Sequence, residues 1–203
     1  MAEPFVAGLV LGAGDSTRLR RPKQLLAYGS GTLLGHVVAT ARECRFDQLL
    51  VAIGGAAAEV RAGVDLAGAD IVQGEAHGEG CSSSIAAALA AIDRRCELLV
   101  LMLGDQPRVS AETVARLLAG RGEAPLAICR YDDARGHPIA FARTLFGELA
   151  ALHGDKGVWR LLDRRANEVA EVAIPGPLPL DVDTEADYAA LLSEQRPLAS
   201  RAA

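Results

Sequence analysis

Short, fully apolar runs followed by glycine alternate with amphipathic segments along most of this chain. The first run, Phe5–Leu11, is followed directly by Gly12-Ala13-Gly14. The runs Gln48–Ile53 and Glu97–Leu103 are also followed by glycine. Runs of this length bounded by glycine are typical of strands buried on both faces, and the segments between them have helical spacing. The alternation therefore predicts an α/β fold with a mostly parallel sheet and helices on both faces.

Capping and turn residues help to bound the remaining elements. Thr32–Cys44 has a helical stripe, and Ser110 is predicted to cap a helix to Ala119, with Thr113 at the capping-box distance. A turn at 132–136 separates two expected strands. The other expected strands are Asp70–Val72, Pro125–Arg130, Pro138–Phe141 and Val169–Ile174, and the other expected helices are Ala56–Ala62, Ser82–Asp93, Leu145–Leu152, Val158–Arg165 and Thr184–Leu192.

One domain is enough for a chain of 203 residues, half of them hydrophobic. We expect this domain over residues 1–195 and a disordered tail over 196–203. The N-terminus lacks the basic and long apolar regions of a signal peptide, and the apolar runs are too short to span a membrane. We therefore expect a cytoplasmic protein without a membrane partner.

The charge and the cysteines exclude several classes of site. A formal net charge of −5 argues against nucleic acid as a partner, since such proteins carry a basic face. The basic cluster of Arg18, Arg20, Arg21 and Lys23 is short and suits a small anion. The four cysteines have no C-x-x-C spacing and no histidine at zinc-ligand spacing, which favours free thiols in a reducing compartment.

The glycine-rich segment after the first strand is the first candidate site. Glycines let a backbone approach a ligand and present its N–H groups to phosphate, while Arg18 and Lys23 would add positive charge. The third position of a dinucleotide fingerprint is Thr17 rather than glycine, and no G-K-[ST] triplet is present. A tight turn with solvated basic side chains is the alternative interpretation. The candidate nucleotide-binding residues are Leu11, Gly12, Ala13, Gly14, Asp15, Ser16, Thr17, Arg18 and Lys23.

A second candidate is Gly104-Asp105-Gln106-Pro107, which follows an apolar strand. In open α/β sheets, ligands bind beyond the carboxyl ends of strands. A carboxylate there suits Mg²⁺, which takes a few carboxylates together with phosphates and water. The alternative is that Asp105 caps the following helix or turn.

The third candidate is Leu180-Asp181-Val182-Asp183-Thr184. Alternation along an extended segment places Asp181 and Asp183 on one side, where they repel unless a cation or hydrogen bonds compensate them. The alternative is that Asp183 or Thr184 caps the last helix. Both interpretations hold together if Asp183 binds the metal and Thr184 is the cap.

Two further segments are less specific. Residues 78–84 form a Gly/Ser segment entering a helix, with Gly80, Ser82 and Ser83 as candidate nucleotide contacts or as a plain N-cap. Gly136, His137 and Pro138 lie in the expected hairpin, and a lone histidine is more often structural than catalytic. No Ser/His/Asp or Cys/His order is apparent.

In combination, these motifs resemble the MobA-like NTP transferase family, and within it most closely the molybdenum cofactor cytidylyltransferases. The matching pieces, in the family's order, are LGAGDSTRL with PK at 11–23, GEGCSSS at 78–84, GDQP at 104–107, GHP at 136–138, GDKG at 154–157 and LDVDT at 180–184. Many relatives have glycine at the position of Arg20. Guanylyltransferase relatives typically read LAGG in the first loop, whereas Ala13 favours cytidine.

The resemblance implies a Rossmann-like fold of the nucleotide-diphospho-sugar transferase type. It implies that Arg18, Lys23 and Asp105 are catalytic, with Arg18 and Lys23 on the NTP phosphates. It also implies that Asp105 and Asp183 hold Mg²⁺, and that the segment 136–138 faces the acceptor. The donor would be CTP and the acceptor molybdopterin carrying molybdenum, with a molybdenum hydroxylase as a further partner.

The expected reaction is an in-line attack of an acceptor phosphate on the α-phosphorus, with release of pyrophosphate. Three alternatives remain open. They are a guanylyltransferase of the same family, a non-catalytic accessory protein that delivers a cofactor, and an NAD(P)-dependent oxidoreductase. The missing third glycine and the absence of an acidic residue after Ile53 argue against the oxidoreductase.

Overall fold

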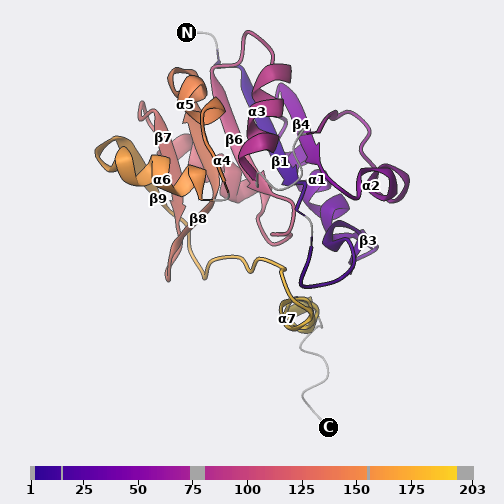
Figure 1. The fold of residues 1–203 in the computed structure, drawn as a ribbon. Coiled ribbons are helices and arrows are strands. Elements are labelled where there is room, and N and C mark those ends of the chain that lie inside the picture. Colours follow the sequence, from indigo (N-terminus) through magenta and orange to yellow (C-terminus); the bar gives the residue numbers. More distant parts are fainter. Residues whose placement is uncertain (1–2, 15, 74–80, 155, 196–203) are drawn as a thin grey trace.

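A seven-stranded sheet forms the centre of the protein (Figure 1). The computed structural model describes residues 3–14, 16–73, 81–154 and 156–195. The strand order is β5-β4-β1-β6-β8-β7-β9, and β2 and β3 form a separate hairpin. The strands are β1 (Val6–Gly12), β2 (Ala27–Tyr28), β3 (Gly31–Thr32), β4 (Gln48–Ile53), β5 (Asp70–Gln73), β6 (Leu98–Leu103), β7 (Leu126–Arg130), β8 (Arg135–Ala142) and β9 (Val169–Ala173).

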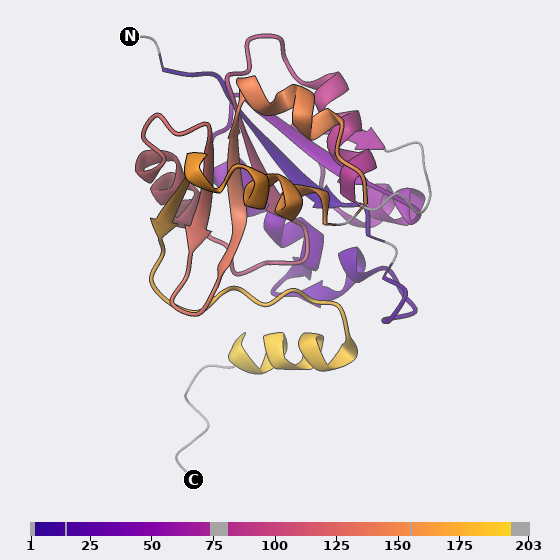
Figure 2. The same cartoon turned by 60° about the vertical axis from the view of Figure 1, so that its left-hand side comes forward.

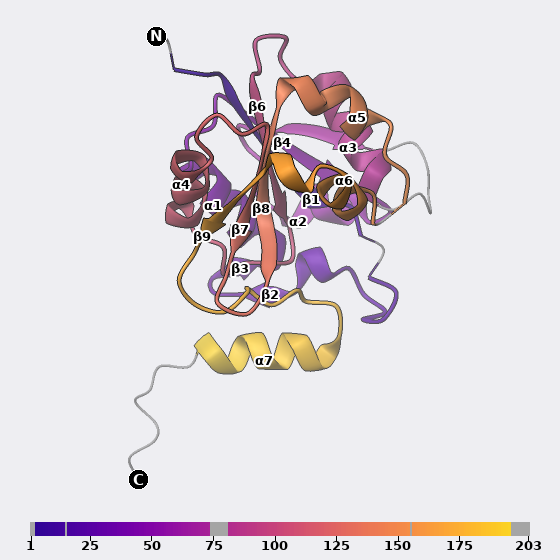
Figure 3. The same cartoon turned by 90° about the vertical axis from the view of Figure 1, so that its left-hand side faces the viewer.

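Helices cover both faces of the sheet, as Figure 3 shows edge-on. One apolar cluster packs α1, α2 and α4 against side chains such as Val10 and Met102. The opposite cluster packs α3, α5 and α6 against Leu9 and Leu101, because successive strand residues face opposite sides. The helices are α1 (Leu33–Glu43), α2 (Ala57–Gly63), α3 (Cys81–Ala91), α4 (Ala111–Gly120), α5 (Phe146–Ala150), α6 (Gly157–Arg164) and α7 (Glu185–Gln195), and the 3₁₀ helices are η1 (Lys23–Leu25), η2 (Arg143–Leu145) and η3 (Ala166–Glu168).

The sheet is mostly parallel, which confirms the predicted fold class. β8 is antiparallel to both neighbours, β6 and β7, whereas the other adjacent strands are parallel. The short turn after β7 explains the reversal, since a tight connection joins antiparallel strands. Ile139 pairs with Leu101, so β8 begins where β6 ends.

Side chains cap the starts of two helices, and the cap at Ser110 confirms a prediction from the sequence. The Oγ1 atom of Thr32 accepts a hydrogen bond of 3.1 Å from the Gly35 N–H at the start of α1. The Ser110 Oγ accepts one of 3.1 Å from the Thr113 N–H at the start of α4. Each cap stabilises its helix by about 1 kcal/mol.

The last helix, α7, lies beyond the carboxyl ends of the central strands, beside the β2–β3 hairpin (Figures 2 and 3). A third apolar cluster joins Leu191 and Val182 to Leu19, Leu26 and Leu33. The Tyr188 hydroxyl donates a hydrogen bond of 2.7 Å to the carbonyl of Ala27. Residues from both ends of the chain thus meet at one edge of the sheet.

Three local expectations need correction. β8 begins at Arg135, so Gly136 lies in a strand rather than in the predicted turn at 132–136. α3 begins at Cys81, so the following serines lie in its first turn rather than at its cap. The segment between the first strand and α1, for which the sequence predicted no strand or helix, contains η1 and the β2–β3 hairpin.

Candidate active site

The side chains of Lys23, Asp105 and Asp183 meet at the carboxyl edge of the sheet. The Lys23 Nζ lies 2.5 Å from Asp105 Oδ2 and 2.8 Å from Asp183 Oδ1. η1 supplies the lysine, the turn after β6 supplies Asp105, and the segment before α7 supplies Asp183. The structure therefore brings together three residues that the sequence places in three separate motifs.

Lys23 is charged and largely shielded from water. Its side chain is 15% exposed and that of Asp105 is 16% exposed. Burial lowers the pKa of Lys23, but attraction to Asp105 and hydrogen bonds to both carboxylates outweigh this effect and raise the pKa above its usual value. An ion pair in this environment costs much more to break than one on the surface.

A capping box at the start of α7 orients Asp183. The Thr184 N–H donates to Asp187 Oδ2 at 2.8 Å, and the Asp187 N–H donates to Thr184 Oγ1 at 3.2 Å. Thr184 is therefore the cap, as one interpretation of the sequence predicted. Asp183, immediately before it, binds Lys23 and also Arg18, whose Nη1 lies 3.3 Å from Asp183 Oδ2. The Arg18 side chain is 68% exposed, so it is free to turn toward a ligand.

Residues of η1 form hydrogen bonds with the first loop, residues 12–19. The Lys23 N–H donates to Ser16 Oγ at 2.9 Å. The Gln24 Nε2 donates to the carbonyls of Gly12 at 2.8 Å and Gly14 at 2.9 Å. Gln24 was not predicted from the sequence, because glutamine ordinarily indicates a surface position.

Two glycines, one after β4 and one after β6 on either side of β1, let the end of β1 and the first loop pack closely. A Cβ atom on Gly104 would lie 2.8 Å from the Leu11 carbonyl oxygen, and one on Gly54 would overlap the Ala13 carbonyl. The glycine that follows each apolar run is the signal in the sequence for this close approach.

Arg20 adopts a left-handed backbone conformation, with φ of 53°. This region disfavours any residue with a Cβ atom and favours glycine. The conformation gives a physical reason for the glycine that many relatives carry at this position. Ser16 has a similar φ of 52°.

Asp181 adds a third carboxyl group to this edge. Desolvation, followed by the charges of Asp105 and Asp183, raises the pKa of Asp181 to about 6, although the residue as a whole is exposed. Three carboxyl groups therefore lie near Lys23, and a positive charge at this edge stabilises their ionised forms.

The remaining nucleotide-site candidates lie at the same edge or outside the described residues. Ser82, which is buried, and Ser83 are in the first turn of α3, which follows the carboxyl end of β5. Thr17 is exposed in the first loop. Asp15 and Gly80 lie outside the described residues, as do parts of two motifs at 78–80 and 155 and the expected tail at 196–203.

The segment Gly136-His137-Pro138 reaches the same edge but is buried. Only 8% of His137 is exposed, and its ring meets Trp159 edge-on at 6.0 Å. Burial lowers the pKa of His137 to about 4, so the imidazole is neutral near pH 7. A direct contact of this segment with an acceptor stays a prediction.

The donor set suits a hard divalent cation that takes its remaining ligands from phosphate and water. One ammonium group reaches oxygens of both Asp105 and Asp183, so both can reach one small cation. Within the described residues, no group of three or more His, Cys, Asp or Glu side chains forms a complete metal site. Cys44, Cys96 and Cys129 are free thiols.

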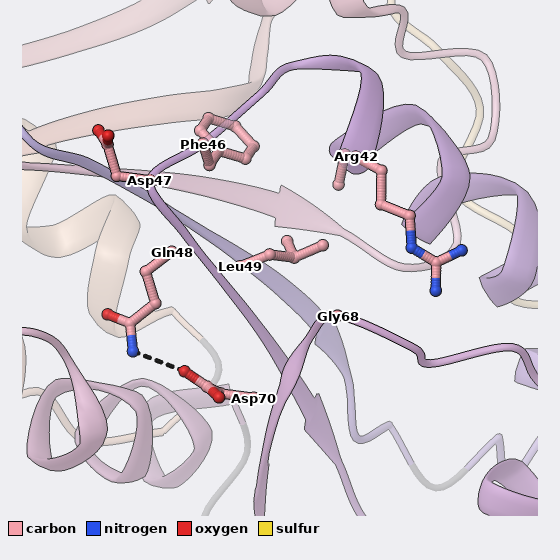
Figure 4. A pocket seen from close by; sticks show the side chains of 8 residues that line it. Arg42, Phe46, Asp47, Gln48, Leu49, Gly68 and Asp70 are labelled. Carbon is pink, nitrogen blue, oxygen red and sulfur yellow. Dashed lines mark hydrogen bonds between the residues drawn. The ribbon is translucent and has the colours of Figure 1, made fainter.

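A surface cleft of about 280 Å³ lies at the opposite end of the sheet, at the amino ends of β4 and β5 (Figure 4). Gln48 donates a hydrogen bond of 2.8 Å to Asp70 across it, and Arg42 lies at its rim. It is therefore separate from the site formed by Lys23 and the two carboxylates. In the part of the chain that the structure describes, no helix is both long and apolar enough to cross a membrane.

A mostly parallel sheet with a glycine-rich loop, a part-buried lysine and paired carboxylates at its carboxyl edge defines a nucleotide-binding α/β protein. Residues 8–169 match the model of the MobA-like NTP transferase domain, and the chain belongs to that family.

Solved structures of similar proteins cover nearly the whole chain. The Rv0371c homolog from Mycobacterium sp. strain JC1 is 51% identical, with a TM-score of 0.88, over 93% of this chain and 96% of that one. Rv0371c of Mycobacterium tuberculosis H37Rv, solved in complex with manganese, is 45% identical, with a TM-score of 0.85, over 95% of this chain and 100% of that one.

Among the curated relatives, the GlmU proteins match over a smaller share of their own length. The bifunctional protein GlmU of Stutzerimonas stutzeri is 35% identical over 177 residues, which are 83% of this chain. The match spans only 37% of GlmU.

Proposed function

We propose that the protein transfers a nucleoside monophosphate, CMP from CTP, onto a terminal phosphate of a pterin-type acceptor that carries molybdenum, with release of pyrophosphate. The observation that carries this proposal is the Lys23 ammonium between Asp105 and Asp183 beside the glycine-rich first loop. Family membership supports nucleotidyl transfer. The motifs shared with molybdenum cofactor cytidylyltransferases support the donor and the acceptor.

The residues of the site suit the charges of such a reaction. An oxygen of the acceptor phosphate would form a bond to the α-phosphorus while the bond from that phosphorus to the bridging oxygen breaks, and pyrophosphate leaves. An ionised phosphate needs no general base. Lys23, Arg18 and the first-loop amides would stabilise the charge on the α-phosphate and the leaving group.

Asp105 and Asp183 would hold a divalent cation, Mg²⁺. The cation would supply further charge neutralisation at the phosphates. The manganese complex of Rv0371c, which is 45% identical, supports a divalent cation in this family. On binding of the metal and NTP, Lys23 would exchange its carboxylate partners for phosphate oxygens.

The experiment that tests the proposal is pyrophosphate release with each NTP in turn, Mg²⁺, and molybdopterin with or without molybdenum. Release that requires both CTP and acceptor would support the whole assignment. Release with GTP would keep the reaction class and change the base. Tight NTP binding without release under any pairing would favour an accessory protein that delivers a cofactor to a partner enzyme such as a molybdenum hydroxylase. No NTP binding would contradict the proposal.

A further inference from the structure

Gln24 is a buried polar residue whose side-chain hydrogen bonds go to the first loop. It is 4% exposed, within η1. Its Nε2 lies 2.8 Å from the carbonyl oxygen of Gly12 and 2.9 Å from that of Gly14. A buried amide is costly unless it is hydrogen-bonded. The burial of Gln24 is thus linked to the shape of the first loop.

The chemistry of the two partners fixes the orientation of the Gln24 amide. Both are carbonyl oxygens, which only accept hydrogen bonds, so the NH₂ group must face them. The two N–H bonds of this group match the two carbonyls. Within the described residues, Oε1 has no hydrogen-bond partner. The polar interactions of this side chain are therefore directed at Gly12 and Gly14.

This contact determines which way a loop peptide faces. In a trans peptide, the carbonyl and the following N–H point in opposite directions. Because the Gly12 carbonyl points toward Gln24, the Ala13 N–H points away from it. Phosphate-binding loops need their N–H groups toward the anion and their carbonyl oxygens, which repel it, turned away. Glycine backbones otherwise rotate freely, and Gly14 is exposed.

Lys23, the residue before Gln24, contacts the same loop at a third position. Its backbone N–H donates a hydrogen bond to Ser16 Oγ. The Lys23 side chain meanwhile reaches Asp105. We propose that Gln24 is a positioning residue, which holds the first loop in the shape that binds the triphosphate and couples that shape to the placement of Lys23. This inference rests on the proposed function.

Two variants of nearly the same shape test it. Gln24→Met removes both donors. Gln24→Glu removes them when the carboxyl group is ionised and restores one when it is protonated. We expect the Kd for CTP with Mn²⁺, measured by calorimetry, to rise roughly tenfold or more in Gln24→Met. For Gln24→Glu, the ratio of its Kd for CTP to that of the wild-type protein should increase as the pH is raised from 5.5 to 8. A role in general stability would not produce this pH dependence.

Gln48→Met is the matched control. Gln48 also binds a backbone carbonyl, that of Ala91, but at the opposite end of the sheet. The Gln48→Met protein should bind CTP with wild-type affinity. Amide hydrogen exchange over residues 12–19, measured without nucleotide, should be faster in Gln24→Met and unchanged in Gln48→Met. Thermal unfolding of each variant checks the fold.

Wild-type affinity and wild-type exchange in folded Gln24→Met would overturn the inference, as would a pH-independent affinity ratio in Gln24→Glu. Both results leave the proposed function standing, since the wild-type protein would still bind CTP. A wild-type protein that binds none of the NTPs would refute the proposed function, and the role of Gln24 with it.

Discussion

The ammonium group of Lys23 lies 2.5 Å from a carboxylate oxygen of Asp105. Its other carboxylate partner, Asp183, stands at the start of the last helix. One cation of the protein thus occupies the position between two carboxylates that would also suit a divalent metal ion. The lysine and the metal are therefore expected to compete when no nucleotide is present.

Replacing Lys23 with methionine should change metal and nucleotide binding in opposite directions. Without the ammonium group, the two carboxylates lose their compensating charge and should bind Mn²⁺ about tenfold more tightly in the NTP-free protein. Affinity for CTP should fall, since a phosphate contact is lost. Titration of Mn²⁺ by electron paramagnetic resonance measures the first effect.

Arg42→Met is a suitable control for the metal titration, because it frees Asp65 in a surface pair remote from the site. A Lys23→Met protein whose Mn²⁺ affinity equals that of the wild-type protein would show that the lysine does not compete with the metal.

Arg20→Gly should stabilise the protein. The left-handed backbone at Arg20, with φ of 53°, carries a steric cost that glycine lacks. Part of this gain is offset by the greater freedom of glycine in the unfolded chain, which leaves a net gain of about 0.5–1 kcal/mol. Urea denaturation measures the difference. Arg20→Ala, which removes the charge and keeps the Cβ atom, should show no such gain, and equal effects of the two variants would contradict the explanation.

His137 should make the folded state sensitive to mild acid. Burial lowers its pKa to about 4 in the folded protein, whereas an unfolded chain binds the proton near pH 6.5. The neutral His137 contributes fully to the free energy of unfolding above pH 6.5. As the pH falls toward 4, the unfolded chain takes up the proton and the free energy of unfolding decreases by up to about 3 kcal/mol. The free energy of unfolding of His137→Leu, measured over this range, should fall less steeply. Parallel curves for the two proteins would assign the loss to other groups.

Local signals in the sequence predicted much of the fold. The apolar runs predicted the strands of the parallel part, and the helix start after Ser110 followed from its capping chemistry. The fold class is confirmed because buried strands followed by glycine and amphipathic helices leave few alternatives.

Long-range relationships were harder to predict. That Asp105 and Asp183 share one lysine depends on α7 returning to the carboxyl edge of the sheet. The burial of Gln24 depends on η1 folding beneath the first loop. No pattern within either segment indicates these contacts, since they follow from tertiary packing.

The most direct measurement of the central claim is the rate of pyrophosphate formation by Asp105→Asn beside the wild-type protein, with CTP, Mg²⁺ and acceptor. Asp65→Asn, at an exposed carboxylate away from the site, is the control for loss of an acidic residue. The proposed site predicts a loss of roughly 100-fold or more in Asp105→Asn, with the fold intact and the control unaffected. A folded Asp105→Asn protein that forms pyrophosphate at the wild-type rate would contradict it.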